Sequence, residues 1–401
     1  MDFEDTPEEA AYRAQVREFL EQNRDRLAPS SMPTTPETID ALRSHEAVLY
    51  DGGYLAVAFS KEMGGQGGTA MQQSLVDQEM RRAGVAEVPN SIGIGMCAPT
   101  VFAHGSDEQR ANLPRLFRGD HMWCQLFSEP ASGSDLAALR TSAVQESDGS
   151  WRVNGQKVWT TGAQYADYGI VLTRTDPTLP KHRGLTMFVI DMHAPGVTVR
   201  PLKQMSGGSE FNEVYFDDVI IADSERLGEV NDGWRVALTT LMNERVAVGG
   251  GGGGLGVDPD ELVKLAAAKL PELDEGTAGV YRRDIGQVLV ENLGTKFTGY
   301  RLLSKISKGE QPGPEASAGK LAGTRAARRG SEIAVHLLGT DGLFAKTEDG
   351  DSLWQGSEAA LPGLAIAGGT DEVLRNIIGE RVLGLPGEPR TDKGAPVGGN
   401  R

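Results

Sequence analysis

The sequence WCQLFSEPASGSD, residues Trp123 to Asp135, combines two patterns that favour a ligand site. The run from Trp123 to Phe127 is mostly apolar and predicts a strand. It leads directly into Ser128 to Asp135, a loop of mainly small residues whose backbone can lie close to a flat or phosphorylated ligand. A strand that ends in such a loop predicts one wall of a cofactor site.

The chain has 401 residues, enough for two or three domains and a large core. Its formal net charge of -16 at pH 7 disfavours nucleic-acid and membrane-surface partners, because it repels phosphate backbones and anionic lipid. The first residues show no secretion signal or transit-peptide pattern, and no apolar run approaches the ~18 residues of a membrane span. We therefore expect a soluble, cytoplasmic protein.

The cysteines and histidines show no ligand spacing. Cys97 and Cys124 both lie among apolar residues, so we expect two buried, reduced thiols. The histidines are scattered along the chain, which argues against a metal site. They are His45, His104, His121, His182, His193 and His336.

Residues 1–122 are predicted to form an N-terminal α-helical domain. Thr6-Pro7-Glu8-Glu9 is a helix start, with a Thr cap and Pro at the first helical position. The apolar residues that follow recur at helical spacing. Further helices are expected over 39–49 and 69–82, and a helical pair between 91 and 119.

From residue 123 to residue 233 the apolar pattern becomes strand-like, so we expect a middle β domain. Asn154-Gly155 lies between two strand-like runs and predicts a tight hairpin turn. Residues 234–385 return to helical spacing and predict a C-terminal α-helical domain, which gives an α+β chain. The tail, residues 386–401, is rich in Pro and Gly and is expected to be disordered.

Six consecutive glycines, Gly249 to Gly254, follow a helix that would otherwise continue. Six glycines cost about 5 kcal/mol relative to alanine in a helix interior. Either the helix breaks here and the run serves as a linker, or the missing side chains widen a pocket. A new helix is expected to begin at Asp258-Pro259.

Three motifs together resemble the acyl-CoA dehydrogenase family of flavoproteins. The loop Ser128 to Asp135 is similar to the family pattern Thr/Ser-Glu-Pro-Gly-Ala-Gly-Ser-Asp, with Ala131 and Ser132 in place of the usual Gly-Ala. Asn154 to Thr161 and the late Gly369-Thr370 match further family motifs in the family's order. The resemblance implies an N-terminal α-helical domain, a β-barrel-like middle domain, a C-terminal four-helix bundle and the cofactor FAD.

The resemblance implies a set of flavin-contacting residues. Phe127 and Ser128 fall where the family lines the flavin pyrimidine edge, and Trp159 falls where a tryptophan flanks the ring system. Taken alone, Trp159 would more often be a core aromatic. Arg282 matches an arginine that reaches the pyrophosphate of a second subunit's FAD, although the adjacent Arg283 makes the register ambiguous. The other implied FAD residues are Gly133, Ser134, Thr160, Thr161, His336, Leu337, Gly339, Thr340, Thr370 and Glu372.

Two of these residues have ordinary alternative roles. His336 replaces the family's usual Gln and could be a simple histidine at a helix end. Thr370 would also cap the helix that carries Leu374, and this role is compatible with cofactor contact.

The family's reaction needs a carboxylate over the α-carbon of a thioester. Many members place this Glu immediately before the late Gly-Thr, where this chain has Gly368. Other members, including bacterial catabolic ones, carry it in a Glu-Arg pair on the helix after the β domain, and Glu244-Arg245 matches that pattern. Thr240 and Leu241 share the helix face of Glu244, which favours a desolvated carboxyl group with a raised pKa. The alternative is a surface Glu paired with Arg245 or another cation.

The remaining substrate contacts follow from the same resemblance. Gly368 keeps a backbone N–H that can polarise the thioester oxygen, and its missing side chain would suit a bulky acyl group. Gly369 lies in the same turn. Ser134 matches a position that touches the acyl-CoA, and Arg245 would fix its helix or touch the CoA side.

The implied function is oxidation of a saturated acyl-CoA to the trans-2-enoyl-CoA, with electrons passed to an electron-transferring flavoprotein. The implied assembly is a homodimer, a homotetramer or an α2β2 complex with a related subunit. Gly368 with Glu244 favours branched, long or ring-bearing acyl chains. Two other classes stay open: a flavin oxidase or monooxygenase on the same scaffold, and a non-catalytic subunit of a heteromeric dehydrogenase.

Overall fold

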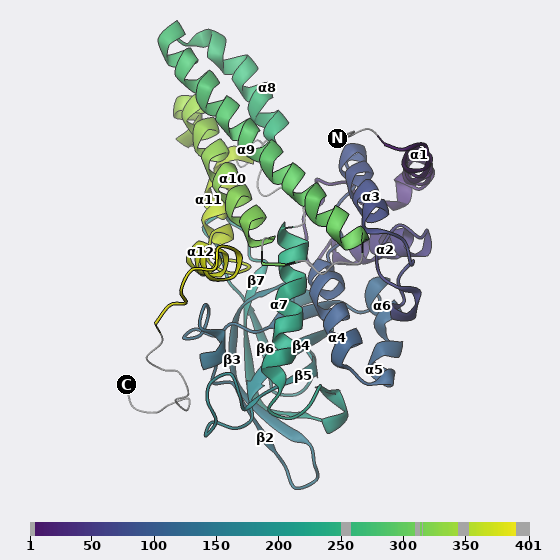
Figure 1. Cartoon of the computed structure of the whole chain (residues 1–401). Helices are drawn as coiled ribbons and strands as arrows, with labels where there is room; N and C mark the ends of the chain where they lie inside the picture. The colour runs from purple at the N-terminus through teal and green to yellow at the C-terminus, as the bar shows by residue number, and fades with distance from the viewer. Residues whose placement is uncertain (1–4, 250–257, 309–312, 315, 344–352, 390–401) are drawn as a thin grey trace. The chain divides into compact units, whose positions relative to one another are not determined.

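The structure is a computed structural model that describes residues 5–249, 258–308, 313–314, 316–343 and 353–389. The chain divides into two compact units. The first contains residues up to 202 and residues 209–244, and the second contains residues 203–208 and 245–389. The presence of both helices and a large sheet confirms the predicted α+β class (Figure 1). The domain boundaries drawn from the sequence stay predictions.

The first unit begins with a group of helices. Thr6 and Thr69 each form a capping box, because the side chain of each accepts from the third helical N–H while a Glu or Gln at that position bonds back. The predicted pair between residues 91 and 119 is instead a π-helical turn, Gly93–Cys97, followed by three short helices. The helices are α1 (Pro7–Gln22), α2 (Ile39–Asp51), α3 (Ala70–Ala83), α4 (Ala98–His104), α5 (Asp107–Ala111) and α6 (Leu113–Phe117).

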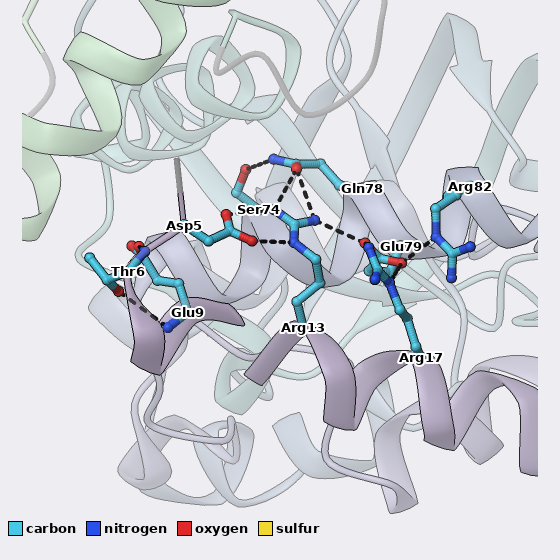
Figure 2. Close-up of polar contacts among 9 residues, drawn as sticks. All are labelled: Asp5, Thr6, Glu9, Arg13, Arg17, Ser74, Gln78, Glu79 and Arg82. Atoms are coloured by element: carbon cyan, nitrogen blue, oxygen red, sulfur yellow. Dashed lines mark hydrogen bonds and ion pairs between the residues drawn. The ribbon is translucent and has the colours of Figure 1, made fainter. Parts of the chain in front are cut away.

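A buried carboxylate joins α1 to α3. Figure 2 shows Glu79 of α3 surrounded by three arginine side chains, Arg13 and Arg17 from α1 and Arg82 from α3. The Glu79 side chain is only 2% exposed. Burial by itself would raise the pKa of Glu79, but the hydrogen bonds from Arg17, Arg82 and Arg13 lower it to about 2. The two helices are therefore held together by a charge that stays ionised at neutral pH.

The middle of the chain forms one eight-stranded sheet with the order β6-β7-β3-β2-β4-β5-β8, while β1 pairs in parallel with β4. Strand β4 is buried on both faces of the sheet: Ile170 and Leu172 pack in one apolar cluster with the N-terminal helices, and Val171 packs in another. The strands are β1 (Trp123–Leu126), β2 (Ser142–Gln145), β3 (Trp151–Thr161), β4 (Tyr168–Arg174), β5 (Leu185–Asp191), β6 (Val197–Pro201), β7 (Phe211–Ile221) and β8 (Arg226–Leu227).

The predicted hairpin at Asn154-Gly155 is wrong. Both residues lie inside β3, where the pairing with β7 shifts register between Val153 and Gly155. The Asn154 amide donates to the Asp218 carboxylate at 3.0 Å and accepts from the Asp218 N–H at 2.9 Å, so it bridges the bulge. Gly155 has φ +151°, and a Cβ there would lie 2.5 Å from the Thr141 hydroxyl. The glycine therefore serves a close approach within the sheet rather than a turn.

The turn between β2 and β3 is formed by a different Asp-Gly pair. Asp148-Gly149 follows β2, the Gly149 N–H donates to Glu146 at 3.0 Å, and Gly149 has φ +89°. The Asp148 carboxylate accepts from the Ser150 N–H at 2.9 Å. Local side-chain bonding thus closes this hairpin.

The second unit is a helical bundle organised around α10 (Ala316–Leu338), which contacts α8, α9, α11 and α12. Figure 1 shows α8, α9 and α10 side by side in green. The helix start predicted at Asp258-Pro259 is confirmed, and the Asp258 side chain caps α8 by accepting from the Asp260 N–H. The helices are α8 (Pro259–Lys269), α9 (Glu275–Ser307), α11 (Leu353–Leu364) and α12 (Asp371–Ile377), with a π-helical turn at Ile378–Val382.

Two predicted features fall mostly outside the described residues. Gly249 ends the helix α7 (Gly233–Gly249), and Gly250 to Gly254 lie outside the described part. Of the tail, residues 386–389 are described and belong to no helix or strand, while residues 390–401 lie outside. Among the described residues, no helix combines the length and apolar character that crossing a membrane requires.

Candidate flavin and acyl-CoA site

The loop Ser128 to Asp135 is held by the buried carboxylate of Glu129. This carboxylate accepts from the backbone N–H groups of Arg140 at 2.7 Å and Thr141 at 2.8 Å. The Glu129 N–H and carbonyl also exchange hydrogen bonds with Ser132, which closes the turn. A loop of small residues that would otherwise have many conformations is thereby fixed.

The partner of Glu129 is Lys157 of β3, whose side chain is 0% exposed. The Lys157 ammonium group donates to a Glu129 carboxylate oxygen and to the Phe127 carbonyl, both at 2.9 Å. Burial lowers the pKa of Lys157 to about 8, and the Glu129 charge opposes this shift. Burial by itself would raise the pKa of Glu129, but the Lys157 charge and the bonds from residues 140 and 141 lower it overall. The pair ties the loop to β3 at the predicted cofactor wall.

Trp159 stands out on this wall because its backbone is left-handed, with φ +61°, at a second bulge in β3. A bulky residue with positive φ is strained, and such strain is concentrated at functional sites. Trp159 is 57% exposed, and its indole lies edge-on to the Phe211 ring, at 6.0 Å between ring centroids. The bulge thus presents the indole outward from the sheet.

The neighbouring atoms fit a flat group with polar edges. The Thr160 hydroxyl is buried and has no hydrogen-bond partner in the described part of the chain. A Cβ at Gly133 would meet nothing within 4 Å, so the loop leaves open space there. Backbone bonds bring Ser128 beside β3, since its carbonyl accepts from the Val158 N–H at 2.9 Å. Of the predicted flavin residues, the structure brings together Phe127, Ser128, Trp159, Thr160 and Thr161.

The face of α7 that carries Glu244 begins in the core of the first unit. Thr240 is fully buried, and its hydroxyl lies 2.9 Å from the Thr100 hydroxyl of α4. Thr239 in turn lies 2.8 Å from the His104 ring. Glu244 follows one turn after Thr240 and is partly buried. This agrees with the predicted helix face of Thr240, Leu241 and Glu244, because Leu241 packs against the apolar core of this unit.

In the second unit, the turn before α12 has two successive left-handed glycines, Gly368 at φ +63° and Gly369 at φ +93°. Thr370 caps α12 as predicted, since its hydroxyl accepts from the Val373 N–H at 3.2 Å. The N–H groups of residues 368, 369 and 370 find no acceptor among the described residues. Three unpaired backbone donors in sequence suit an oxygen atom that gains negative charge.

Most of the other predicted cofactor residues are exposed in the single chain. Arg282 lies on α9, is 52% exposed and pairs with Glu275 at 2.7 Å. His336, Gly339 and Thr340 are exposed at the end of α10. Leu337 is buried in the bundle core and Glu372 is exposed on α12. The side chain of Arg245 lies outside the described part of the chain. The FAD and substrate roles of all these residues stay predictions.

Sequence reasoning missed a cavity of about 450 Å³ in the first unit. Its wall contains an aromatic pair, His182 and Trp234, with ring centroids 4.9 Å apart. Arg183 and Arg235 also line it. The signal in the sequence for this cavity was the basic and aromatic residues at 182–183 and 234–235. No local pattern indicated that these two segments lie together.

Profiles of three domains match the chain in order. They are the acyl-CoA dehydrogenase N-terminal domain over residues 6–120, the middle domain over residues 124–219 and the C-terminal domain over residues 231–383. These matches place the chain among FAD-dependent oxidoreductases that act on CH–CH bonds. The chain belongs to the acyl-CoA dehydrogenase family.

Several of the similar proteins are mycobacterial. Acyl-CoA dehydrogenase FadE34 of Mycobacterium tuberculosis is 40% identical over 343 residues, which are 85% of this chain but 46% of that protein, so the chain spans about half of its length. Acyl-CoA dehydrogenase IpdE1 of the same organism is 33% identical over 94% of this chain and 98% of its own. The ChsE4–ChsE5 complex from M. tuberculosis matches with a TM-score of 0.78 and 32% identity, over 97% of this chain and 100% of that chain. A solved steroid acyl-CoA dehydrogenase, Tcur3481–Tcur3483, matches with a TM-score of 0.80 and 26% identity, over 97% and 100%.

Proposed function

We propose that the chain oxidises a saturated acyl-CoA thioester to the trans-2-enoyl-CoA, with Glu244 as the base that removes the α-proton. FAD, when bound, supplies the acceptor for the β-hydrogen, which leaves as hydride. The residues proposed to hold FAD in the first unit are Phe127, Ser128 and Trp159 with the two threonines that follow. The orphaned Thr160 hydroxyl and the open space at Gly133 support this assignment.

The observation that carries the proposal is the position of Glu244. Its helix face is fixed one turn earlier by the buried Thr240 and its contact with Thr100. Glu244 itself is partly buried, and partial desolvation favours a carboxyl group with enough basicity to take a proton from carbon. Glu244 also precedes the region whose side chains are not described, so Arg245 stays a proposed neighbour of the CoA.

The turn at Gly368 supports the second half of the chemistry. The negative charge that forms on the thioester oxygen during proton removal needs donors already in place. The N–H groups of Gly368 and its two successors are unpaired within the described chain, and the first two of these residues are glycines without side-chain bulk. This supports acyl groups that are branched, long or ring-bearing, and the steroid acyl-CoA dehydrogenase among the solved relatives is consistent with it.

The cavity lined by the His182–Trp234 pair supports binding of the CoA nucleotide. Aromatic faces suit an adenine ring, and the cations Arg183 and Arg235 suit phosphates. Asp232, which pairs with Arg235 at 2.6 Å, offsets one of the two charges. We propose this cavity as the nucleotide end of the acyl-CoA site.

We further propose that an electron-transferring flavoprotein reoxidises the enzyme and that the cytoplasm is its location. For the assembly we propose an α2β2 complex with a related subunit, in which this chain carries the base. The ChsE4–ChsE5 relative is solved as a complex of two proteins, which supports a heteromer over a homodimer or homotetramer.

The test is anaerobic titration of the purified holoprotein with a panel of acyl-CoA thioesters, followed by flavin absorbance. Bleaching by at least one thioester is expected for the wild type. Glu244→Gln should slow it by about 10²–10⁴-fold, the range attributed to a general base, with FAD content unchanged. The matched control is Glu229→Gln, which removes an exposed carboxylate from the loop before α7.

Three results would count against this function. Equal bleaching in wild type and Glu244→Gln removes Glu244 as base. Rapid reoxidation of the reduced protein by air favours the oxidase or monooxygenase class. Protein without FAD, alone and together with a co-expressed related subunit, favours a non-catalytic role.

A further inference from the structure

A second buried lysine lies beside the Gly368–Gly369–Thr370 turn. Lys320, on α10, has a side chain only 6% exposed. Its ammonium group donates to the Gly369 carbonyl at 3.1 Å and to the Asp371 carboxylate at 3.3 Å. Because burial of an ammonium group is costly unless its hydrogen bonds are satisfied, these two acceptors account for its place in the bundle.

The Gly368–Gly369–Thr370 turn needs a contact from another element to hold its backbone conformation. We call this contact the clamp. Gly368 and Gly369 both have positive φ, and glycine crosses between positive and negative φ at little cost, so the peptide planes here can flip. Few backbone bonds hold the segment: the Ala367 N–H donates to Gly363 at 2.9 Å, and the Asp371 N–H donates to Ala365 at 3.0 Å. No described backbone bond is made by the three N–H groups in between.

The Lys320 ammonium fixes the peptide that joins Gly369 to Thr370. In a trans peptide the carbonyl and the N–H point in opposite directions. With the Gly369 carbonyl drawn toward Lys320, the Thr370 N–H points away from α10, and the torsions of the preceding glycine are constrained in turn. The Asp371 carboxylate neutralises the charge of Lys320. Lys320 therefore acts by orienting the peptide between Gly369 and Thr370, and not by a net electric field.

We propose that Lys320 is a positioning residue, whose bond to the Gly369 carbonyl holds the Gly368–Gly369–Thr370 turn in the conformation that presents its N–H groups to the thioester oxygen. This inference rests on the proposed function for the thioester, but the clamp itself does not. Lys320 is expected to touch neither substrate nor FAD.

The test compares Lys320→Met, which keeps the side-chain length without the donor, with Lys320→Arg, which keeps a cation and its donors. The first readout is hydrogen exchange of the Asp371 and Val373 amides, which are bonded in this structure. In Lys320→Met their exchange should accelerate at least about tenfold, a free-energy change of about 1.4 kcal/mol, while Lys320→Arg stays closer to wild type. Lys264→Met, at an exposed lysine of α8, is the matched control.

The second readout follows the chemistry of the holoprotein. In Lys320→Met the flavin-bleaching rate at saturating acyl-CoA should fall at least tenfold, with the half-saturating concentration changed less than threefold. Bound cinnamoyl-CoA should lose the red shift of its absorption band that a polarised thioester carbonyl produces. A merely structural lysine would change the melting temperature without this split between rate and affinity.

The outcomes separate the clamp from the function. Wild-type amide exchange in Lys320→Met overturns the clamp whether or not any acyl-CoA bleaches the flavin. Faster exchange with an unchanged bleaching rate and red shift overturns the link to the thioester oxygen. Asp371→Asn should change amide exchange less than Lys320→Met does, because the bond from the Lys320 ammonium to the Gly369 carbonyl remains. An equal change in the two variants would show that the Lys320–Asp371 ion pair holds the turn, and would overturn the role of the carbonyl bond. Absence of bleaching in the wild type would refute the proposed function alone.

Discussion

Replacement of Lys157 by Met should both destabilise the first unit and weaken FAD binding. The substitution keeps the length of the side chain but removes the ammonium group that joins Glu129 to the Phe127 carbonyl. Removing one partner of a buried ion pair costs about 3–5 kcal/mol. Glu129 keeps two backbone donors, from Arg140 and Thr141, so the lower end, about 3 kcal/mol, is expected.

A double-mutant cycle separates the pair from its surroundings. Glu129→Gln alone leaves the Lys157 cation buried, and the double variant leaves neither charge. We expect the double variant to be less destabilised than the sum of the two single variants by about 2–3 kcal/mol. Chemical unfolding followed by circular dichroism gives the free energies, and fluorescence titration gives the FAD dissociation constant, which should rise at least about tenfold in Lys157→Met.

The pH dependence gives a second check on the same pair. The pKa of Lys157 lies at about 8 in the folded chain, below its ordinary value of 10.5, because of burial. As the pH rises through about 8, Lys157 loses its charge in the folded state, so the coupling to Glu129 should shrink between pH 7 and pH 9. Additive single variants at pH 7, or normal FAD affinity in Lys157→Met, would refute the argument that this pair holds the flavin wall.

Three further changes test other parts of the fold. Burial raises the pKa of Glu46 to about 8, although the hydrogen bonds from Asn90 and the charge of Arg43 oppose this shift. The free energy of unfolding of the wild type should therefore fall between about pH 5 and pH 8, by at most about 1.4 kcal/mol per pH unit. Chemical unfolding of Glu46→Gln should not show this pH dependence. The arginines around Glu79 lower its pKa to about 2, so its stabilisation is present above pH 4.5 and lost toward pH 2. Glu79→Gln should lower the free energy of unfolding at neutral pH by about 2–3 kcal/mol and lose this acid dependence. An acid-unfolding midpoint equal to that of the wild type would contradict this role of Glu79. Gly155→Ala, with its Cβ 2.5 Å from the Thr141 hydroxyl, should lower the melting temperature by several degrees, about 1–3 kcal/mol, and a neutral effect would show that the bulge has room.

Short-range features could be predicted from the sequence. The caps at Thr6 and Thr370 are each set by one side chain and the helix that follows it, and both are present. The same local reasoning failed at Asn154-Gly155. A pair that favours a two-residue turn also favours a bulge, and the choice depends on Asp218 in β7 and on Thr141, the residue before β2.

The sequence indicated the loops of the predicted site but not the side chains that hold those loops in place. Glu129 and Lys157 both stand in motifs noted in the sequence, yet 28 positions separate them, and no periodicity joins a loop residue to a residue inside a distant strand. The left-handed backbone of Trp159 was equally invisible, because it follows from a register shift between β3 and β7. Pairing across strands, rather than local propensity, decides which side chains reach the cofactor wall.

Each unit thus contains a buried lysine with the same pair of acceptors, a backbone carbonyl and a carboxylate. Lys157 binds the Phe127 carbonyl and Glu129, and Lys320 binds the Gly369 carbonyl and Asp371. A compact ammonium group suits this task because its three donors reach a carbonyl and a carboxylate together, whereas the planar guanidinium of arginine has a fixed fork. Both carbonyls adjoin segments of small residues, which lack the side chains that would hold their own backbone. In the proposed function these segments leave space for a ligand. In each case the lysine holds this backbone through its hydrogen bond to the carbonyl, and the carboxylate neutralises the charge of the lysine.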